Sequence, residues 1–137
     1  MARLEEFPSV SETILFALLR DEPGALGAAC TPLNESTIDK YYDWNDGTCF
    51  QARTLLQLAV TFSAGRCSAA LLQGGADPNL KSPTDGKTAL HCACLKGLSP
   101  ASINLIAYLL RHGGNVSIAD FSGSIPTDLL IKMNENK

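Results

Sequence analysis

Hydrophobic residues recur at helical spacing in short segments that are separated by turn-forming residues. In residues 11–20 the apolar positions repeat every three or four residues and Ser11 is a candidate N-cap, so a helix is predicted there. Its apolar face consists of Ile14, Leu15, Leu18 and Leu19. Residues 21–24 (DEPG) predict a turn, and residues 25–30 predict a short second helix, which Gly27 weakens. This part of the chain is therefore expected to form a pair of short helices.

The middle of the chain repeats itself. Residues 54–59 (TLLQLA) recur 34 positions later as residues 88–93 (TALHCA). Each copy precedes a segment that ends in a leucine pair and glycine, and these segments, residues 70–79 and 108–117, lie 38 positions apart. The second unit therefore carries an insertion of four residues. We expect it near residues 97–102, where Gly, Ser and Pro interrupt the helical pattern.

A third copy starts at residues 120–130, where Gly123 matches Gly86 of the preceding copy. A period in the thirties with two short helices per unit is typical of solenoid proteins. Glycines such as Gly75 and Gly113, just past the leucine pairs, suit the left-handed residue that ends a helix. Because one unit cannot bury its apolar face alone, the units are predicted to stack.

These units resemble the ankyrin repeat. The pattern of that family runs roughly Asp-Gly-x-Thr-Pro-Leu-His-x-Ala, then a glycine turn, then a second helix ending Leu-Leu-x-x-Gly-Ala-x-x-Asn. Residues 85–117 follow it closely, with alanine in the proline position and glycine in the second alanine position. Residues 54–79 are similar from the threonine onward, with Gln57 in place of the histidine and Ser63 in place of the turn glycine.

The resemblance implies an all-α fold: a helix-turn-helix solenoid of about three to four repeats with a degenerate N-terminal cap. We expect one domain over residues 1–137. Its predicted parts are a capping repeat with a long aromatic loop (1–47), a repeat (48–84), a second repeat (85–119) and a truncated C-terminal repeat (120–137).

Composition and charge exclude several classes of protein. The chain is 45% hydrophobic, and its longest apolar stretch covers six residues, against the about 20 that a membrane helix needs. Residues 1–47 carry a net charge of −6 and residues 48–137 carry +3, without any run of Lys or Arg. We therefore expect neither a membrane nor a nucleic acid as partner. Five irregularly spaced cysteines and no secretory signal predict an intracellular, reducing location, cytoplasmic or nuclear.

The connection between the first and second units is about eight residues longer than its counterpart, and it is rich in aromatic residues. Long loops are often functional, and Tyr and Trp are enriched at binding hot spots. The aromatic residues between 39 and 50 are therefore candidates for partner binding: Tyr41, Tyr42, Trp44 and Phe50. The alternative interpretation is that these rings fold over the first repeat as part of its cap, and the sequence does not decide between the two.

A second candidate surface follows from the resemblance, which implies a concave face made by loop tips and first helices. By position this face includes Arg53, Gln57, Lys81, Asp85, Lys87, Cys92, Lys96 and Phe121. Any one of these side chains could equally be solvated and without a role, so their joint placement carries the hypothesis.

Metal binding and catalysis are not expected. His91, Cys92 and Cys94 invite a zinc interpretation, but a Cys-x-Cys spacing on a helix points the two sulfurs in different directions. No motif places a nucleophile beside His91 or His112, the two histidines, and no phosphate-binding loop occurs. We therefore expect no enzyme activity, cofactor or metal.

The sequence thus predicts a protein–protein interaction module that binds a partner protein as an adaptor or as an inhibitor. Small ankyrin-type inhibitors of cell-cycle kinases have a similar length. The alternative is a structural ankyrin segment of a larger assembly, or a subunit that self-associates through its C-terminal repeat. We expect a monomer or a weak homodimer.

Overall fold

The computed structural model describes residues 8–30, 37–45, 50–97 and 99–135. The described part contains seven helices and two strands. In chain order they are α1 (Glu12–Leu19), α2 (Pro23–Ala29), β1 (Tyr41–Asn45), β2 (Phe50–Thr54), α3 (Leu55–Thr61), α4 (Gly65–Gln73), α5 (Ala89–Leu95), α6 (Pro100–Arg111) and α7 (Pro126–Glu135).

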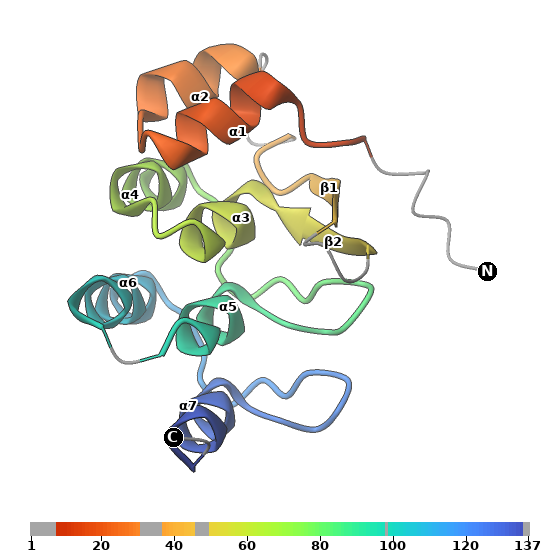
Figure 1. Cartoon of the computed structure of the whole chain (residues 1–137), viewed down its shortest axis with the longest axis vertical. Coiled ribbons are helices and arrows are strands. Elements are labelled where there is room, and N and C mark those ends of the chain that lie inside the picture. Colours follow the sequence, from red (N-terminus) through yellow and green to blue (C-terminus); the bar gives the residue numbers. More distant parts are fainter. Residues whose placement is uncertain (1–7, 31–36, 46–49, 98, 136–137) are drawn as a thin grey trace.

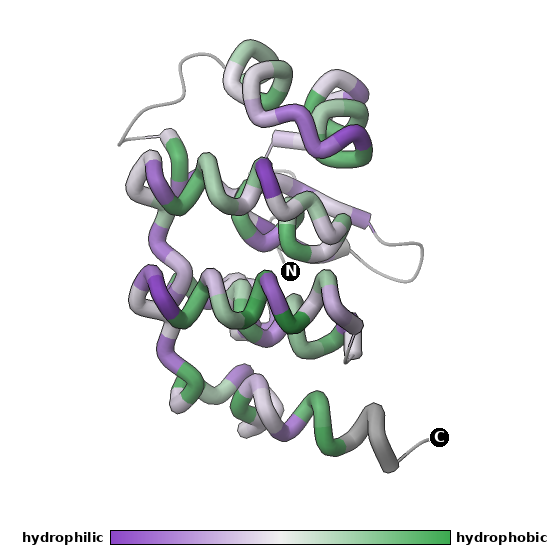
Figure 2. Tube along the Cα trace, turned by 90° about the vertical axis from the view of Figure 1, so that its left-hand side faces the viewer, coloured by the Kyte–Doolittle hydropathy of each residue, from purple (hydrophilic) through white to green (hydrophobic). Residues whose placement is uncertain are grey.

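The helices form two columns, as Figure 1 shows. Helices α1, α3, α5 and α7 follow one another in the inner column, and α2, α4 and α6 lie beside them in the outer column. The connections that precede α3, α5 and α7 project to the other side of the inner column (Figure 1). Figure 2, turned by 90°, shows the same layers stacked from α1 and α2 down to α7. This is a helix-turn-helix repeat fold, as the sequence predicts.

Threonine and serine caps set where the helices begin. Thr54 and Thr88 each accept a hydrogen bond from the backbone N–H three residues later, and the side chains of Gln57 and His91 return to the cap backbone. These two capping boxes satisfy amides that a helix start leaves unpaired. Helix α4 has no cap of its own. Instead, the Asp21 carboxylate of the first unit accepts from the first amides of α4, at 3.0 and 2.8 Å.

Left-handed residues end the helices at the predicted positions. Gly75 and Gly113 have φ of +102° and +95°, as a residue past a helix end often does. Ser63 stands where the ankyrin repeat usually has its turn glycine, and it also adopts a positive φ of 58°. The four-residue insertion in residues 88–117 lengthens the second helix of that unit more than its turn. Helix α6 has twelve residues where α4 has nine, and the preceding turn has four residues where its counterpart has three.

The all-α prediction is wrong in one place, because part of the predicted aromatic loop forms a β-hairpin. Strand β1 pairs antiparallel with β2, and Tyr42 lies opposite Arg53 in the register. Side chains of the next connection complete the pairing of β2: the Ala52 N–H donates to the Thr84 hydroxyl at 3.2 Å, and the Ser82 hydroxyl donates to the Ala52 carbonyl. Strand β2 therefore has hydrogen-bond partners on both edges, with β1 on one edge and Ser82 and Thr84 on the other.

One continuous core runs through the stack. It holds leucines of every unit up to α6, and among them Leu18, Leu55, Leu58 and Leu109 are fully buried. Burial of a leucine side chain contributes about 1.5 to 3 kcal/mol, so stacking supplies the stability that single units lack. Within the described residues, no helix has the length and apolar character that crossing a bilayer requires.

Candidate functional site

Three extended segments, named fingers here, project beyond the inner helices on the side opposite to the outer helices. They are the hairpin of β1 and β2, residues 80–88 and residues 118–125, and each leads into an inner helix. Hydrogen bonds link successive fingers: the Tyr41 hydroxyl donates to the Lys81 carbonyl at 2.8 Å, and the Phe121 N–H donates to the Asp85 carbonyl at 3.0 Å. The fingers therefore hold a fixed position relative to the inner helices.

A pocket of about 140 Å³ lies in the corner between the first finger and helices α3 and α5. The hairpin, the end of α3 and the end of α5 all contribute to it. Its lining residues are Trp44, Gln51, Arg53, Thr61, Cys92, Leu95 and Lys96. Four of the twelve predicted partner-binding residues thus meet here: Trp44, Arg53, Cys92 and Lys96.

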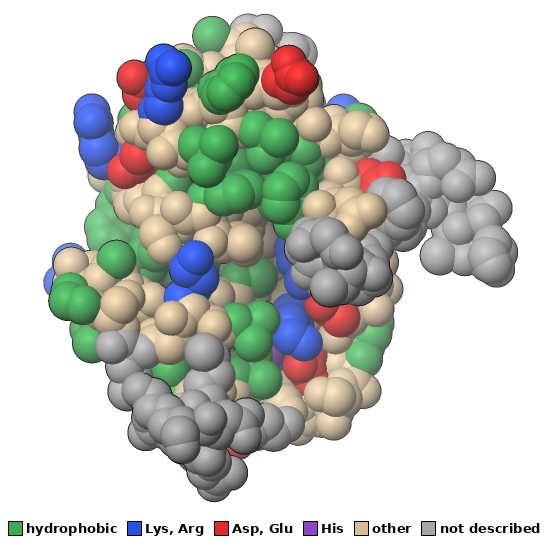
Figure 3. Space-filling view, viewed as in Figure 1, with side chains coloured by type: hydrophobic (Ala, Val, Ile, Leu, Met, Phe, Trp, Pro, Cys, Tyr) green, Lys and Arg blue, Asp and Glu red, His purple; other side chains and the backbone are tan. Residues whose placement is uncertain are grey.

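The pocket has an apolar wall and a cationic edge. The half-buried Trp44 ring meets the Phe62 ring edge-on, with centroids 5.3 Å apart, and Leu95 is 42% exposed. Figure 3 shows hydrophobic side chains gathered over α1 and α3 on this face. The exposed Lys96 amine donates to the Thr61 carbonyl at 2.7 Å, which fixes its position beside the apolar wall. Tryptophan is among the residues most enriched at binding hot spots, so Trp44 is the candidate anchor of this pocket.

Ion pairs connect the fingers along this face. Arg53 donates to both carboxylate oxygens of Asp85, at 3.0 and 2.9 Å, and is only 4% exposed. Burial alone would raise the pKa of Asp85, but the hydrogen bonds and charge of Arg53, with smaller contributions from Lys87, lower it. In the next pair the Lys87 amine lies 3.0 Å from an Asp120 oxygen. The bidentate pair of Arg53 with Asp85 and the pair of Lys87 with Asp120 hold successive fingers together.

We expect Asp120 to make the fold sensitive to acid. Burial would raise its pKa, but hydrogen bonds from Ser122, Ser124 and Lys87 lower it below the usual range. A lowered folded-state pKa means that the carboxylate stabilises the fold above its unfolded pKa of about 4, and that this stabilisation is lost as the pH falls. Urea midpoints between about pH 6 and pH 3 should therefore fall more steeply for the wild type than for Asp120→Asn. Equal slopes would contradict the role of Asp120.

Several predicted site residues are structural instead. Tyr42 is buried in the core, where burial first and the Cys30 thiol second raise its pKa to about 12. The buried Gln57 amide donates to the Leu80 and Lys87 carbonyls, both at 3.1 Å, so it holds the second finger. Gln57 faces the interior because the first turn of α3 packs on the following finger, whereas Tyr42 projects from β1 into the core beside Cys30. We therefore remove Tyr42 and Gln57 from the candidate surface.

The remaining predicted residues lie elsewhere along the fingers. Tyr41 is half-buried. Lys81 and Phe121 are exposed, and the Lys81 amine lies 5.5 Å from the centre of the Phe121 ring. Phe50 begins β2, but its side chain lies outside the described residues. The interpretation of the aromatic segment as a cap thus fits Tyr42, and its interpretation as a binding surface remains open for Trp44.

Three residues of the pocket were not predicted from the sequence: Gln51, Thr61 and Leu95. The signal for two of them was helical spacing. Thr61 lies four positions after Gln57 and Leu95 three positions after Cys92, and such pairs share a helix face. The signal for Gln51 was strand pairing, because it lies opposite Trp44 in the register.

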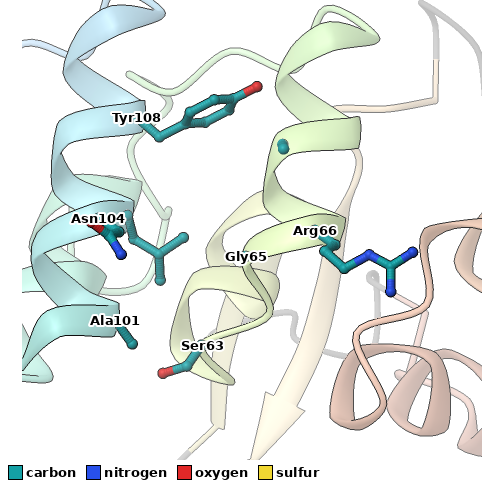
Figure 4. A pocket seen from close by; sticks show the side chains of 8 residues that line it. Ser63, Gly65, Arg66, Ala101, Asn104 and Tyr108 are labelled. Carbon is teal, nitrogen blue, oxygen red and sulfur yellow. The ribbon is translucent and has the colours of Figure 1, made fainter.

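A larger pocket of about 430 Å³ lies on the outer column, between α4 and α6. Figure 4 shows Tyr108, Asn104 and Ala101 on one wall and Ser63 on the other, with the Arg66 guanidinium turned away from the gap. The Tyr108 hydroxyl accepts a hydrogen bond from Gln73 at 3.2 Å. Nothing charged faces this pocket from the labelled residues. In the described part of the chain, no three His, Cys, Asp or Glu side chains are placed to hold a metal ion.

Comparison with known families decides what kind of unit carries this surface. The ankyrin repeat model matches residues 85–121, which include the end of the second finger, α5 and α6. This segment is an ankyrin repeat. Ankyrin repeats are in general protein–protein interaction modules and are generally not enzymes. The pocket on the inner face is therefore partly built by an ankyrin repeat, with α5 supplying Cys92 and Leu95.

The chain is also similar to three plant proteins. It is 37% identical over 84 residues to zinc finger CCCH domain-containing protein 50 of Oryza sativa subsp. japonica. The matched residues are 60% of this chain and 13% of that protein. It is 34% identical over 82 residues to zinc finger CCCH domain-containing protein 66 of Arabidopsis thaliana, covering 59% and 13%. A third, protein 24 of Oryza sativa subsp. japonica, is 35% identical over 79 residues. The chain thus spans about an eighth of the length of the first two relatives.

Proposed function

We propose that this ankyrin-repeat chain binds a partner protein through the pocket between the first finger, α3 and α5. The observation that supports this is the convergence of Trp44 from the hairpin with Leu95 and Lys96 from the end of α5 on one accessible corner. The partner supplies an apolar side chain that packs against Trp44 and Leu95. Acidic groups beside it face Lys96 and the exposed Lys81. The chain then acts as an adaptor or as an inhibitor that covers a surface of its partner.

Two further features of the proposal concern the setting. The four described cysteines, Cys30, Cys67, Cys92 and Cys94, are buried free thiols, which suits a protein that works in a reducing compartment, cytoplasmic or nuclear. A second candidate function is that of a structural segment in a larger assembly. It is favoured by the relatives, in which the matched region is a small part of a much longer protein.

Replacing Trp44 by alanine is expected to weaken partner binding by about thirtyfold or more, because loss of a central aromatic anchor costs about 2 kcal/mol. Leu95→Glu is expected to weaken binding as well, since it places a carboxylate beside the apolar wall. Partners captured from an extract by the wild type would be identified by mass spectrometry. Dissociation constants of the purified pair would then be measured by calorimetry for each variant.

Ala70→Glu is the matched control, because Ala70 is exposed on α4 in the outer column and lies outside this pocket. Trp44→Phe tests whether the ring itself matters, and it is expected to retain most of the affinity. If Trp44→Ala and Leu95→Glu, both folded by circular dichroism, bind the partner as tightly as Ala70→Glu does, the proposed pocket is wrong.

A further inference from the structure

Hydrophobic side chains continue from the proposed pocket toward α1 along the inner helices. Each of the first three inner helices is followed by one residue with a positive φ, at Asp21, Ser63 and Gly97. The residues two positions earlier are therefore equivalent in the three layers: Leu19, Thr61 and Leu95. Leu19 is 62% exposed and Leu95 is 42% exposed, and Thr61, in the layer between them, lines the pocket. These positions follow one another along one side of the stack.

Aromatic rings supply the apolar surface of the middle layer. Phe62 follows Thr61 and meets the Trp44 ring edge-on, and both rings are half-buried. The position equivalent to Phe62 in the next layer is Lys96, whose amine reaches the Thr61 carbonyl of the layer above. Phe62 therefore lies on the path from the pocket to Leu19, and hydrophobic side chains gather over α1 and α3 on this face (Figure 3). The apolar stripe is defined by four side chains: Leu19, Phe62, Trp44 and Leu95.

The spacing of the layers favours a helix as the occupant of the apolar stripe. Packed helices lie about 8 to 10 Å apart, so equivalent positions on α1, α3 and α5 recur at about that distance. Seven residues of an α-helix advance about 10.5 Å and return to nearly the same face. In an extended strand, residues on one face lie about 6.7 or 13.4 Å apart, which fits this spacing less well. A helix laid along the stripe can therefore place one apolar side chain on each layer.

A cation borders the α5 end of the apolar stripe. Lys96 is exposed, its amine donates to a backbone carbonyl, and no carboxylate of the described residues pairs with it. The other charged residue of the pocket, Arg53, is held by both carboxylate oxygens of Asp85. At the α1 end, Arg20 lies over the Phe16 ring, on the face that lines the separate groove between α1 and α2. The stripe therefore favours a carboxylate beside Lys96 and apolar groups over the rest of its length.

We propose that the partner contributes an amphipathic α-helix that lies along the apolar stripe. This inference rests on the proposed function and names the element of the partner that binds. Apolar residues seven positions apart contact Leu19, the pair of Trp44 and Phe62, and Leu95 in turn, as in other complexes that seat a helix in a groove. An acidic residue beside the last of them pairs with Lys96. The contact covers two layer spacings, so it takes about fourteen residues, or four turns, of the partner helix.

The test uses synthetic peptides and the whole chain, with binding followed by fluorescence anisotropy. The helical peptide has leucine at every seventh position, one glutamate beside its last leucine, and alanine and glutamine elsewhere. One control peptide carries two prolines that break the helix between the leucines, and a second has lysine in place of the glutamate. The helical peptide is expected to bind with a dissociation constant on the order of 100 μM, and the proline peptide at least about tenfold more weakly.

Variants of the chain locate the peptide. Leu19→Glu lies outside the pocket and changes an exposed side chain, and it is expected to weaken the helical peptide by about tenfold or more. Lys96→Glu is expected to reverse the charge preference, so that the lysine peptide binds more tightly than the glutamate peptide. Ala70→Glu, in the outer column, should bind like the wild type. Circular dichroism confirms that each variant is folded.

Three results would overturn the proposal. They are a helical peptide that binds no better than its proline control, a Leu19→Glu variant that binds it like the wild type, and a charge preference that Lys96→Glu leaves unchanged. A captured partner whose affinity falls in Trp44→Ala but not in Leu19→Glu would show that the pocket binds without the stripe. In that case the helix proposal fails and the proposed function stands, whereas an unchanged partner affinity in Trp44→Ala contradicts the proposed function itself.

Discussion

His91→Ala is expected to lower the free energy of unfolding by about 3 kcal/mol. The ring is fully buried and makes contacts in two directions. Its Nδ1 accepts the Thr88 N–H at 3.0 Å, so Nε2 carries the proton and donates to the Ser124 carbonyl at 2.8 Å. Alanine leaves the Thr88 N–H buried without this acceptor, at a cost of about 1 to 3 kcal/mol, and adds a cavity. It also removes one donor from the Ser124 carbonyl, which still accepts from the Asp120 N–H at 2.9 Å. Urea unfolding followed by circular dichroism measures the change.

The preceding unit provides the control for this substitution. Gln57 occupies the matching position and uses its amide in the same way, accepting from the Thr54 N–H and donating to carbonyls of the next finger. His91→Gln is therefore expected to restore more than half of the stability that alanine removes. Hydrogen exchange should show the loss in His91→Ala first at Ser124 and α7. If glutamine destabilises as much as alanine, hydrogen bonding is not what His91 contributes.

Local chemistry explains why the helical part of the fold could be predicted from the sequence. The left-handed glycines and the apolar faces depend on residues within four positions of one another, and the structure confirms the glycines at Gly75 and Gly113. The caps at Thr54 and Thr88 are equally local, because each threonine accepts from the amide three residues later. The long insertion was different, because the helical repeat offered no template for it. An alternating pattern was nevertheless present there, because Tyr42 and Trp44 lie on either side of Asp43 in the sequence. Tyr42 is buried in the core, and the Asp43 backbone N–H donates to the Pro8 carbonyl.

The candidate surface could be predicted only in part, because burial depends on contacts between distant residues. The sequence placed Arg53, Cys92 and Lys96 on the inner face, and the structure brings them together with Trp44. It did not show that Arg53 is held by Asp85, 32 positions away, or that Gln57 reaches carbonyls 23 and 30 positions away. A repeat pattern therefore places residues on a face, and only the packing of successive fingers shows which of them remain accessible.

Gly86→Ala is expected to destabilise the fold by about 3 kcal/mol, more than its backbone angle alone would cost. Gly86 has a φ of +78°, at which an L-residue costs about 1 to 2 kcal/mol. A Cβ there would also lie 2.8 Å from the Phe121 backbone nitrogen, so the third finger would have to move. That movement breaks the hydrogen bond from the Phe121 N–H to the Asp85 carbonyl, which adds about 1 kcal/mol.

Gly123, the equivalent glycine of the next finger, separates the two contributions to the Gly86 effect. Its φ is +88°, but nothing lies within 4 Å of the position that a Cβ would occupy. Gly123→Ala therefore carries the backbone cost alone, and its loss of stability in urea unfolding is expected to be about 1 to 2 kcal/mol. The excess in Gly86→Ala measures the contact between successive fingers. Equal losses for the two variants would mean that the third finger yields freely, and that the fingers do not present one fixed surface to a partner.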